Sequence, residues 1–200
     1  EHKYDLILKG GRVIDPANNV DGLLDVAIVG RHIARVAKDI SPQDSRRTAD
    51  VSGLVVAPGL IDLHAHFYGY EAAVLPDAHC LPEGTTTAVD VGGSGHLTFD
   101  DFDQTIISRS RTNVFALLNI AGEGMVGLPE QDLEGMSIDL TSAKIAQRPD
   151  RIVGVKVAHY RGPGWQPLDR GVQAAENTGV FVMVDQAPIK SRPNNEMLLE

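Results

Sequence analysis

The sequence contains a single cysteine, Cys80. An internal disulfide is therefore excluded, and so is a zinc site built from several cysteines. Basic charge is also scarce, because 18 Lys and Arg residues stand against 27 Asp and Glu residues, giving a net charge of -9. Such a balance argues against binding to nucleic acid or to an anionic membrane surface. No apolar run approaches the ~18 residues of a membrane span.

What remains is an ordinary globular composition, with 42% hydrophobic and 22% charged residues. The scarcity of cysteine fits a reducing compartment, so a cytoplasmic location is favoured. The chain begins at Glu1 rather than at Met, which keeps export after removal of a signal peptide open as an alternative.

The first 54 residues have the texture of short strands. The segment "YDLILKGGRVID" predicts a strand, a turn at Gly10 and Gly11, and a second strand. The segment "LLDVAIVGRHIARVAKDI" repeats this plan with a turn at Gly30 and Arg31. We expect residues 1–54 to form a first domain, a small sheet or a portion of a β-sandwich.

From Val55 onward, apolar runs alternate with segments that can be helical. The runs are Val55–Phe67, Thr85–Gly92, Asn113–Ala121, Ile152–Tyr160 and Val180–Ala187. This alternation predicts five parallel βα units, and near-continuous runs such as "IVGVKV" indicate strands buried on both faces. The expected fold class of residues 55–200 is therefore α/β.

Two helices and one long loop can be placed between these strands. Thr98 is a candidate cap for "FDDFDQTIISRSR", and "PLDRGVQAAENTG" predicts a helix that ends at Gly179. The irregular stretch 122–136 follows the third strand, where long loops often carry function. Asn119 and Glu123 are candidates for substrate contact there, and a role in the turn is an equal alternative.

The motif "VVAPGLIDLHAHF" places His64 and His66 two residues apart at the end of a strand. Period two puts both imidazoles on one face, at the edge where α/β proteins carry their chemistry. Neutral imidazole is the commonest metal ligand in proteins. The motif therefore predicts that both histidines bind one divalent metal ion, against the alternative of two incidental histidines.

Lys156 interrupts the otherwise apolar strand "IVGVKVAHY". Period two groups it with Ile152, Gly154 and Ala158 on one face, whereas His159 alternates away and is expected outside the set of metal ligands. A buried ammonium is costly, so the amine must be paired, neutral or modified. A neutral amine can take up CO2 as a carbamate that bridges two metal ions. The alternative is a strand-end lysine that reaches solvent.

Taken together, these segments resemble the amidohydrolase superfamily, in its dihydroorotase, D-aminoacylase and deacetylase-like branch. "YDLILKGGRVIDPANN" is similar to the opening sandwich strands of that family, and "VVAPGLIDLHAHF" to its first, metal-binding barrel strand. "EGTTTAVDVGGSG" is similar to its second strand, and "IVGVKVAHY" to the strand that bears a carboxylated lysine. The resemblance implies a (β/α)8 barrel beside a β-sandwich.

The resemblance also implies the chemistry, namely hydrolysis of an amide or ester bond by a hydroxide held between two divalent metal ions, with zinc the favoured ion. His64 and His66 would bind one ion, and N6-carboxylated Lys156 would bridge to a second. Where the family's next strand supplies a histidine, this sequence has Asp185, which departs from the pattern and leaves a retained second metal, a single-metal site and an inactive site all open.

The family's remaining histidine and its general-base aspartate have no counterpart before residue 200. A barrel needs ~250 residues, so we expect the N-terminal part of a longer polypeptide, with completion by a second chain, as in a homo-oligomer, as the alternative. The function expected is a metal-dependent hydrolase acting on a small acylated or cyclic substrate, at carbon–nitrogen bonds other than peptide bonds. Two alternatives stay open: a catalytically inactive amidohydrolase-like scaffold, and an unrelated α/β binding domain.

Overall fold

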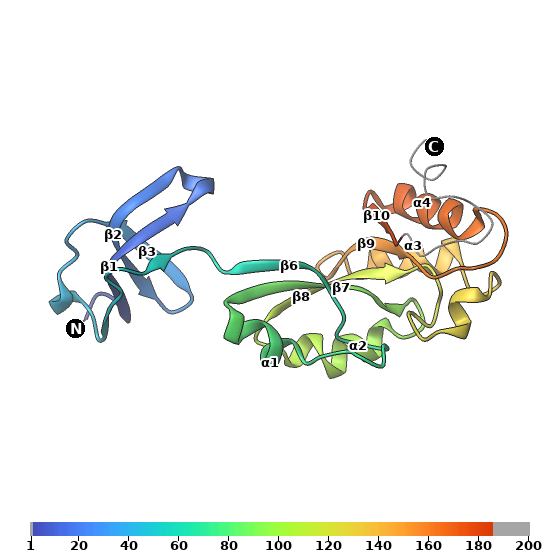
Figure 1. Ribbon diagram of the computed structural model, residues 1–200, viewed down its shortest axis with the longest axis horizontal. Coiled ribbons are helices and arrows are strands. Elements are labelled where there is room, and N and C mark those ends of the chain that lie inside the picture. Colours follow the sequence, from blue (N-terminus) through green and yellow to red (C-terminus); the bar gives the residue numbers. More distant parts are fainter. Residues whose placement is uncertain (1, 186–200) are drawn as a thin grey trace. The chain divides into compact units, whose positions relative to one another are not determined.

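A computed structural model describes residues 2–185 of the chain. Contacts divide it into two compact units, Glu1–Pro58 and Gly59–Glu200, which are treated separately here (Figure 1). Within residues 2–185, no helix is both long enough and apolar enough to cross a lipid bilayer.

The first unit is a five-stranded sheet in the order β3-β2-β1-β4, with β5 also paired to β1. β1 to β3 form an antiparallel meander, whereas β4 and β5 run parallel to β1. Its elements are β1 (Leu6–Asp15), η1 (Pro16–Asn18), β2 (Val20–Val29), β3 (His32–Ala37), η2 (Pro42–Asp44), β4 (Thr48–Asp50) and β5 (Val55–Val56). The β2–β3 turn at Gly30 and Arg31 is confirmed. That this sheet is part of a sandwich stays a prediction.

The predicted turn at Gly10 and Gly11 is wrong, because β1 continues through both glycines with a bulge between Leu8 and Gly11. Gly10 has a φ of 78° and donates its N–H to Asp25 Oδ1 at 2.9 Å. Asp25 also accepts from Lys9 Nζ and from Ile40 N. A buried carboxylate thus organises the bulge, and local sequence carries no sign of this partner on the next strand.

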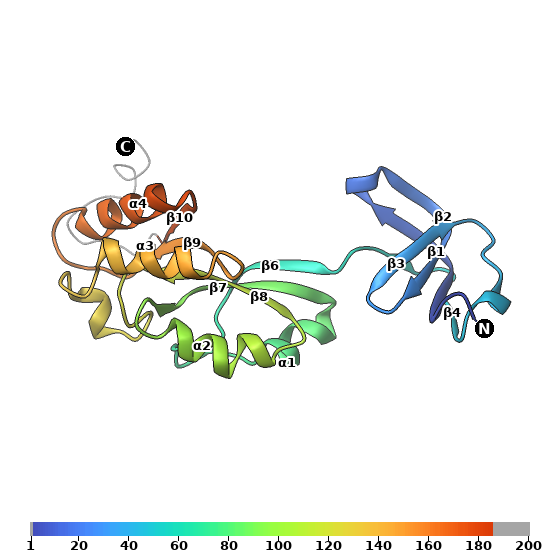
Figure 2. The ribbon, with the colours of Figure 1, turned by 180° about the vertical axis from the view of Figure 1, so that it is seen from behind.

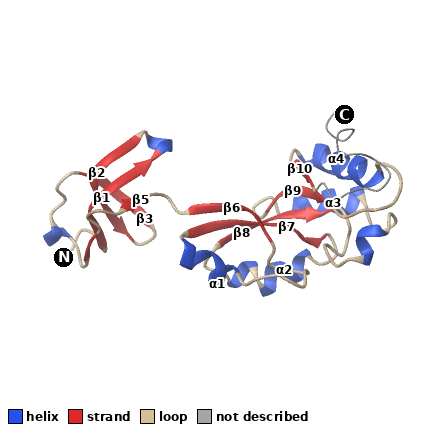
Figure 3. Ribbon diagram, viewed as in Figure 1, coloured by secondary structure: helices blue, strands red, loops and turns tan. Residues whose placement is uncertain are grey.

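The second unit contains a curled sheet of parallel strands in the order β10-β9-β8-β7-β6, and it confirms the expected α/β class (Figures 1 and 3). The strands are β6 (Leu60–Ala65), β7 (Thr85–Gly95), β8 (Asn113–Asn119), β9 (Ile152–Val157) and β10 (Phe181–Val184). β6, β8, β9 and β10 lie within predicted apolar runs, whereas β7 starts with its run at Thr85 and continues three residues beyond the predicted end at Gly92. The last run, Val180–Ala187, is described only as far as Asp185.

Helices cover one face of this sheet (Figure 2). They are α1 (Pro76–Cys80), η3 (Leu81–Glu83), α2 (Phe99–Thr105), η4 (Ile107–Arg109), α3 (Ile138–Gln147) and α4 (Gln166–Thr178). The short helix η5 (Leu128–Gln131) lies instead in the loop after β8. α4 ends at Gly179 as predicted, with a φ of 72° at that glycine. α2 begins at Phe99, but Thr98 does not cap it, because its hydroxyl accepts from Gly95 N and donates to the Glu123 carbonyl.

The two faces of the sheet carry different clusters. On β8, Val114, Ala116 and Leu118 pack with the helices, whereas Leu117 packs with strand residues of the opposite, inner face. The side chains of that inner cluster are Val89, Val91 and Leu117, with Phe115, Val153 and Met183 packed against them. Burial on both faces explains why the central strands β7, β8 and β9 are apolar over most of their length.

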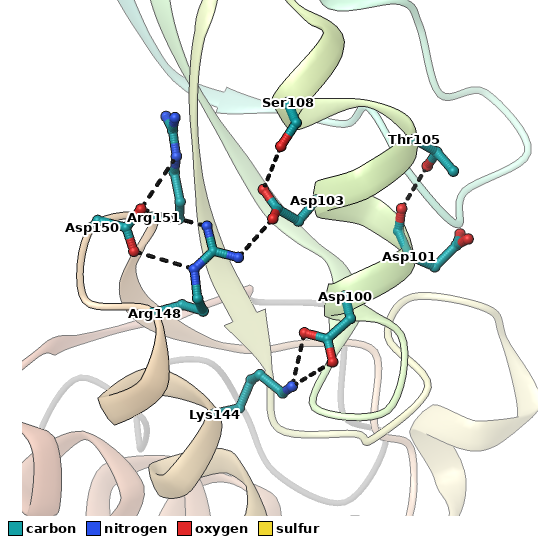
Figure 4. A network of polar contacts seen from close by, with 9 residues as sticks. All are labelled: Asp100, Asp101, Asp103, Thr105, Ser108, Lys144, Arg148, Asp150 and Arg151. Atoms are coloured by element: carbon teal, nitrogen blue, oxygen red, sulfur yellow. Dashed lines mark hydrogen bonds and ion pairs between the residues drawn. The ribbon is translucent and has the colours of Figure 1, made fainter.

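Ion pairs join α2 to α3 on the outside of the second unit (Figure 4). Arg148 Nη1 donates to Asp103 Oδ2 at 2.6 Å, and its guanidinium lies over the Phe99 ring, 5.6 Å from the centroid. Lys144 Nζ donates to both carboxylate oxygens of Asp100 at 2.9 Å. These contacts hold the helices that back the strand ends.

Candidate metal centre

His64 and His66 lie at the carboxyl end of β6, and their rings approach each other in an edge-to-face arrangement. The centroids are 5.4 Å apart with an interplanar angle of 82°. His66 also contacts the Tyr70 ring at 5.3 Å, and its Nδ1 atom is buried with no hydrogen-bond partner in residues 2–185. Burial lowers the pKa of His66, and the neighbouring His64 lowers it further. The neutral imidazole favoured in this way is the form that binds metal ions.

Asp90 fixes the backbone that follows these histidines. This side chain is fully buried, and it accepts hydrogen bonds from Phe67 N at 2.7 Å and from Gly93 N at 2.8 Å. Burial raises the pKa of Asp90 to about 6, although the bonds from backbone N–H groups oppose the shift. A carboxyl group on β7 therefore sets where the end of β6 and its histidines lie.

Lys156 lies on β9 and is 1% exposed. Among the described residues, its Nζ has no hydrogen-bond partner, and the nearest carboxylate oxygen, Asp185 Oδ2, is 3.7 Å away, too far for a hydrogen bond. Burial lowers the pKa of Lys156, and Asp185 opposes this shift. The alternative in which this lysine reaches solvent is excluded by the geometry.

The aliphatic part of Lys156 passes over Gly92, which has a φ of 89°. A Cβ atom at Gly92 would lie 2.7 Å from Lys156 Cγ and 3.0 Å from Lys156 Cβ. Only a residue without a side chain leaves room there, and only glycine adopts this φ readily. Gly92 therefore leaves the space that the Lys156 side chain occupies.

The grouping of Lys156 with Ile152 on one face is wrong. β9 contains an extra residue at Val153, since Ala116 pairs with Ile152 and the next residue, Leu117, pairs with Gly154. Ile152 consequently packs with the helices. Lys156 instead pairs with Met183, which belongs to the inner cluster.

Asp185 follows β10 directly, and its backbone N–H donates to the Val157 carbonyl at 2.9 Å. Its carboxylate is close to two nitrogen atoms, with Oδ2 3.7 Å from Lys156 Nζ and 3.7 Å from His159 Nε2. Asp185 therefore lies beside both Lys156 and His159.

His159 and Glu130 also lie in this group, although sequence reasoning set the first aside and overlooked the second. His159 Nδ1 lies 3.1 Å and 3.2 Å from the two carboxylate oxygens of Glu130, whose side chain is almost fully buried. Alternation does not apply to His159, because β9 ends at Val157 and His159 has a φ of 59°. The available sequence signal for Glu130 is an acidic residue in the long loop after the third strand, and its burial is visible only in the structure.

The two candidates for substrate contact have other surroundings. Asn119 is buried, and its amide donates to the Gly92 carbonyl and to Glu130 Oε1 while accepting from Ala121 N. It therefore supports the loop that carries Glu130. Glu123 is exposed and is absent from the walls of the cavity beside this group. Neither residue is used as a substrate contact below.

An open cavity of ≈ 720 Å³ adjoins the group. Tyr70, which contacts His66, and His159, which approaches Asp185, both line it. Its other walls come from the loops after β6, β8 and β9, namely Gly69, Glu71, Met125, Val126, Gly127, Leu128, Glu130, Gln131 and Arg161. A small molecule bound there would contact Tyr70 and His159, the residues that join the cavity to His66 and Asp185.

The donor chemistry of this group suits a divalent metal once Lys156 is considered. Within residues 2–185, no three His, Cys, Asp or Glu side chains are gathered closely enough to hold an ion by themselves. Lysine is not among those residue types, but a carbamate on its amine would add an anionic oxygen ligand. Buried His66 Nδ1 and Lys156 Nζ find no hydrogen-bond partner in the described part of the chain, and they are the atoms that such a modification and an ion would satisfy.

Curated proteins similar to this chain carry two kinds of name. A deacetylase of Enterococcus faecalis is 32% identical over 190 residues, which is 90% of this chain and 50% of that protein. A deacetylase of Agrobacterium fabrum is 32% identical over 154 residues, and a dihydroorotase of Streptococcus thermophilus is 30% identical over 162 residues. Each of these two alignments spans 72% of this chain and 38% of the relative. The chain thus spans half or less of these relatives' length, and no protein-family model matches it.

Solved structures of enzymes are also similar to this chain. The chain is similar to an adenine deaminase, with a TM-score of 0.82 and 28% identity over 98% of this chain and 54% of the other. It is also similar to a dihydroorotase, with a TM-score of 0.76 and 26% identity over 90% of this chain and 50% of the other.

Proposed function

The chain belongs to the amidohydrolase superfamily, and from this membership we propose that the protein is a metal-dependent hydrolase. It would cleave an amide bond other than a peptide bond, or an ester bond, in a small acylated or cyclic substrate. The observation that carries the proposal is the buried amine of Lys156, which has no hydrogen-bond partner among the residues described and lies next to Asp185 at the strand ends that bear His64 and His66.

The proposed ligands divide into two sets. His64 and His66 would hold one divalent ion, for which zinc is the favoured candidate. Lys156, carboxylated on Nζ, would bridge to a second ion for which Asp185 is a further ligand. When bound, such ions lower the pKa of a water ligand toward ~7 and polarise a substrate carbonyl.

The residues of the chain prepare this chemistry in three ways. Burial keeps His66 neutral and available as a ligand. Burial also favours the neutral amine of Lys156, whose nitrogen can bond to the carbon of CO2 while one proton leaves to solvent. The resulting carbamate carries the negative charge that two cations require, and Gly92 leaves room for the lysine stem beneath it.

The adjoining cavity would hold the substrate. Its apolar wall includes Tyr70, Val126 and Leu128, and Arg161 supplies a guanidinium. Within residues 2–185, that guanidinium makes no ion pair, although the Arg161 backbone N–H donates to Gln131 Oε1 at 2.9 Å. A free cation beside an apolar wall favours a substrate with an apolar part and an anionic group.

Elemental analysis of the purified protein tests the proposal. Wild-type protein should contain bound divalent metal, and the double variant His64→Ala/His66→Ala should lose it, whereas His79→Ala on exposed α1 should retain it. A panel of N-acyl amino acids, cyclic amides and acyl esters, assayed with zinc or manganese, identifies the substrate. Metal-free wild-type protein with no turnover on this panel would instead support a non-catalytic scaffold.

A further inference from the structure

We propose that His159 is a metal ligand through Nε2, that buried Glu130 orients it, and that it joins Asp185 and carboxylated Lys156 at the second ion. This inference rests on the proposed function. It places a histidine ligand just after the end of β9, three residues after Lys156. The next strand, β10, is followed by the carboxylate of Asp185, the other side chain of the proposed set.

The first observation that supports this inference is the contact between Glu130 and His159. Glu130 is 2% exposed, and both of its carboxylate oxygens lie within 3.2 Å of His159 Nδ1. A carboxylate in this position accepts the Nδ1–H of the ring and leaves the lone pair on Nε2. Histidine ligands commonly donate their second ring N–H to a carboxylate in this way, which fixes the tautomer and the direction of the ring.

The second observation is the direction in which His159 Nε2 points. Nε2 lies 3.7 Å from Asp185 Oδ2. Zinc binds nitrogen and oxygen ligands at about 2.1 Å, so an ion at that distance from both atoms would make an angle of about 125° between them. This angle is already near the tetrahedral value, and a small side-chain adjustment would reach it. The same Asp185 oxygen faces Lys156 Nζ at 3.7 Å, which brings the third ligand of the set to the same place.

The third observation is the backbone conformation of His159. Its φ of 59° lies in the left-handed region, which is uncommon for residues other than glycine. Gln131 holds this conformation from both sides, because its Nε2 donates to the His159 carbonyl at 2.8 Å and its Oε1 accepts from Arg161 N at 2.9 Å. Strained conformations held by their surroundings cluster at functional sites. Here the strain takes the ring out of strand alternation and aims it at Asp185.

A purely structural role would make His159 a cation between the carboxylates of Glu130 and Asp185. The two roles differ in what metal binding requires. As an ion-pair partner, His159 would be dispensable for the ions, whereas as a ligand it would be necessary for one of them.

The test titrates the metal-stripped full protein with Zn²⁺ in bicarbonate buffer, against a chromophoric chelator. Wild type should bind two ions, and His159→Ala should bind one. Glu130→Gln should still bind two, with the affinity for the second ion weakened about 10–100-fold. His79→Ala is the matched histidine control and should behave as wild type. Cobalt substitution adds a spectroscopic readout, because losing a nitrogen ligand should alter the visible absorption of the second ion in His159→Ala.

The outcomes separate this inference from the proposed function. Two ions with unchanged affinities in both His159→Ala and Glu130→Gln would overturn the role of His159 and leave the hydrolase proposal standing. A wild type that binds only the ion dependent on His64 and His66 would also overturn it. A wild type that binds no Zn²⁺ would overturn the metal-dependent function itself. If His159→Ala fails to fold by circular dichroism, the second-site affinity of Glu130→Gln decides the question.

Discussion

The amine of Lys156 and the carboxylate of Asp185 lie 3.7 Å apart at the ends of adjacent parallel strands, with Lys156 buried and Asp185 partly exposed. A direct charge-assisted hydrogen bond would be shorter, at about 2.7–2.9 Å. The two groups are therefore close enough to bind the same metal ion, but too far apart to form a direct hydrogen bond with each other.

Replacing Lys156 tests the carbamate directly. Lys156→Ala should lose the second metal ion and most activity, and short carboxylic acids should restore part of both by taking the place of the carbamate. Lys156→Arg should not restore them, because a guanidinium can neither form a carbamate nor ligate a metal. Elemental analysis and turnover are the measurements, with Lys38→Ala at an exposed position as the control. Native turnover by Lys156→Arg would contradict the two-metal site.

Gly92→Ala should disturb the site without touching a charged group. The new Cβ would lie 2.7 Å from Lys156 Cγ, and the φ of 89° would be strained, at a cost of about 1–3 kcal/mol in unfolding free energy. Gly84→Ala is the matched control, since Gly84 has a φ of 78° and open space around its Cβ position. Denaturant unfolding and metal content should show a loss of stability in both variants and a loss of the second ion in Gly92→Ala alone. Equal metal content in the two variants would count against the role of Gly92.

Asp90 should make stability depend on pH in an unusual direction. Its pKa rises from 3.8 to about 6 on folding, so the folded state binds more protons between these values and stability falls as pH rises through about 6. The difference corresponds to about 3 kcal/mol at most. The stability of wild type relative to Asp90→Asn should therefore decrease between pH 4 and pH 7, measured by urea unfolding at each pH.

Asp77 supplies a control of opposite sign. Hydrogen bonds from Thr112 N and Arg111 N lower its pKa, so its contribution is present above the unfolded pKa and is lost as pH falls below it. Wild type relative to Asp77→Asn should accordingly lose stability toward acid. Two curves of the same slope would contradict the assignment for Asp90.

Arg148→Ala should loosen the contact between α2 and α3 shown in Figure 4. The bond from Arg148 to Asp103 is short and partly shielded, and hydrogen bonds to charged groups contribute about 1.5–3 kcal/mol. Arg151 contacts the more exposed Asp150 at 3.6 Å and donates to Asn113 Oδ1 at 3.2 Å at the surface, so Arg151→Ala should cost less than about 1 kcal/mol. Thermal and urea unfolding would measure both. A smaller loss for Arg148→Ala than for Arg151→Ala would show that the network does not hold these helices.

Arg161→Gln should alter substrate selection. If the guanidinium binds an anionic group in the cavity, its loss should raise KM for carboxylate-bearing substrates by about tenfold or more, with kcat and neutral substrates little changed. Arg35→Gln, at an exposed position of the first unit, is the control. Equal changes for charged and neutral substrates would exclude recognition by charge.

Sequence reasoning is most accurate where one physical constraint dominates a segment. The parallel strands are predictable because burial on both faces requires continuous apolar runs. His64 and His66 are predictable as neighbours because strand period two needs no tertiary information. The helix end at Gly179 follows from the ease with which glycine adopts a positive φ.

Errors arise where a distant residue decides the local structure. The bulge at Gly10 depends on Asp25, a partner on the next strand, and looks like a turn in isolation. His159 and Glu130 are 29 residues apart, and their contact depends on a left-handed residue that alternation cannot anticipate. Asn119 is a candidate for substrate contact in the sequence and ends β8 in the structure, and whether its amide faces a ligand or the protein is settled only by packing.

The extra residue at Val153 has a consequence for how such a site can arise and be lost. Ile152 and Lys156 are four residues apart, and in an unbroken strand they would share a face, which here is the helix-covered face. The inserted residue reverses that parity and turns the amine toward the histidines. Removing one codon from this strand would restore the parity while leaving every proposed ligand in the sequence. If Lys156 is the residue that then changes face, a single-residue deletion in β9 would remove the second metal site without any substitution of Lys156.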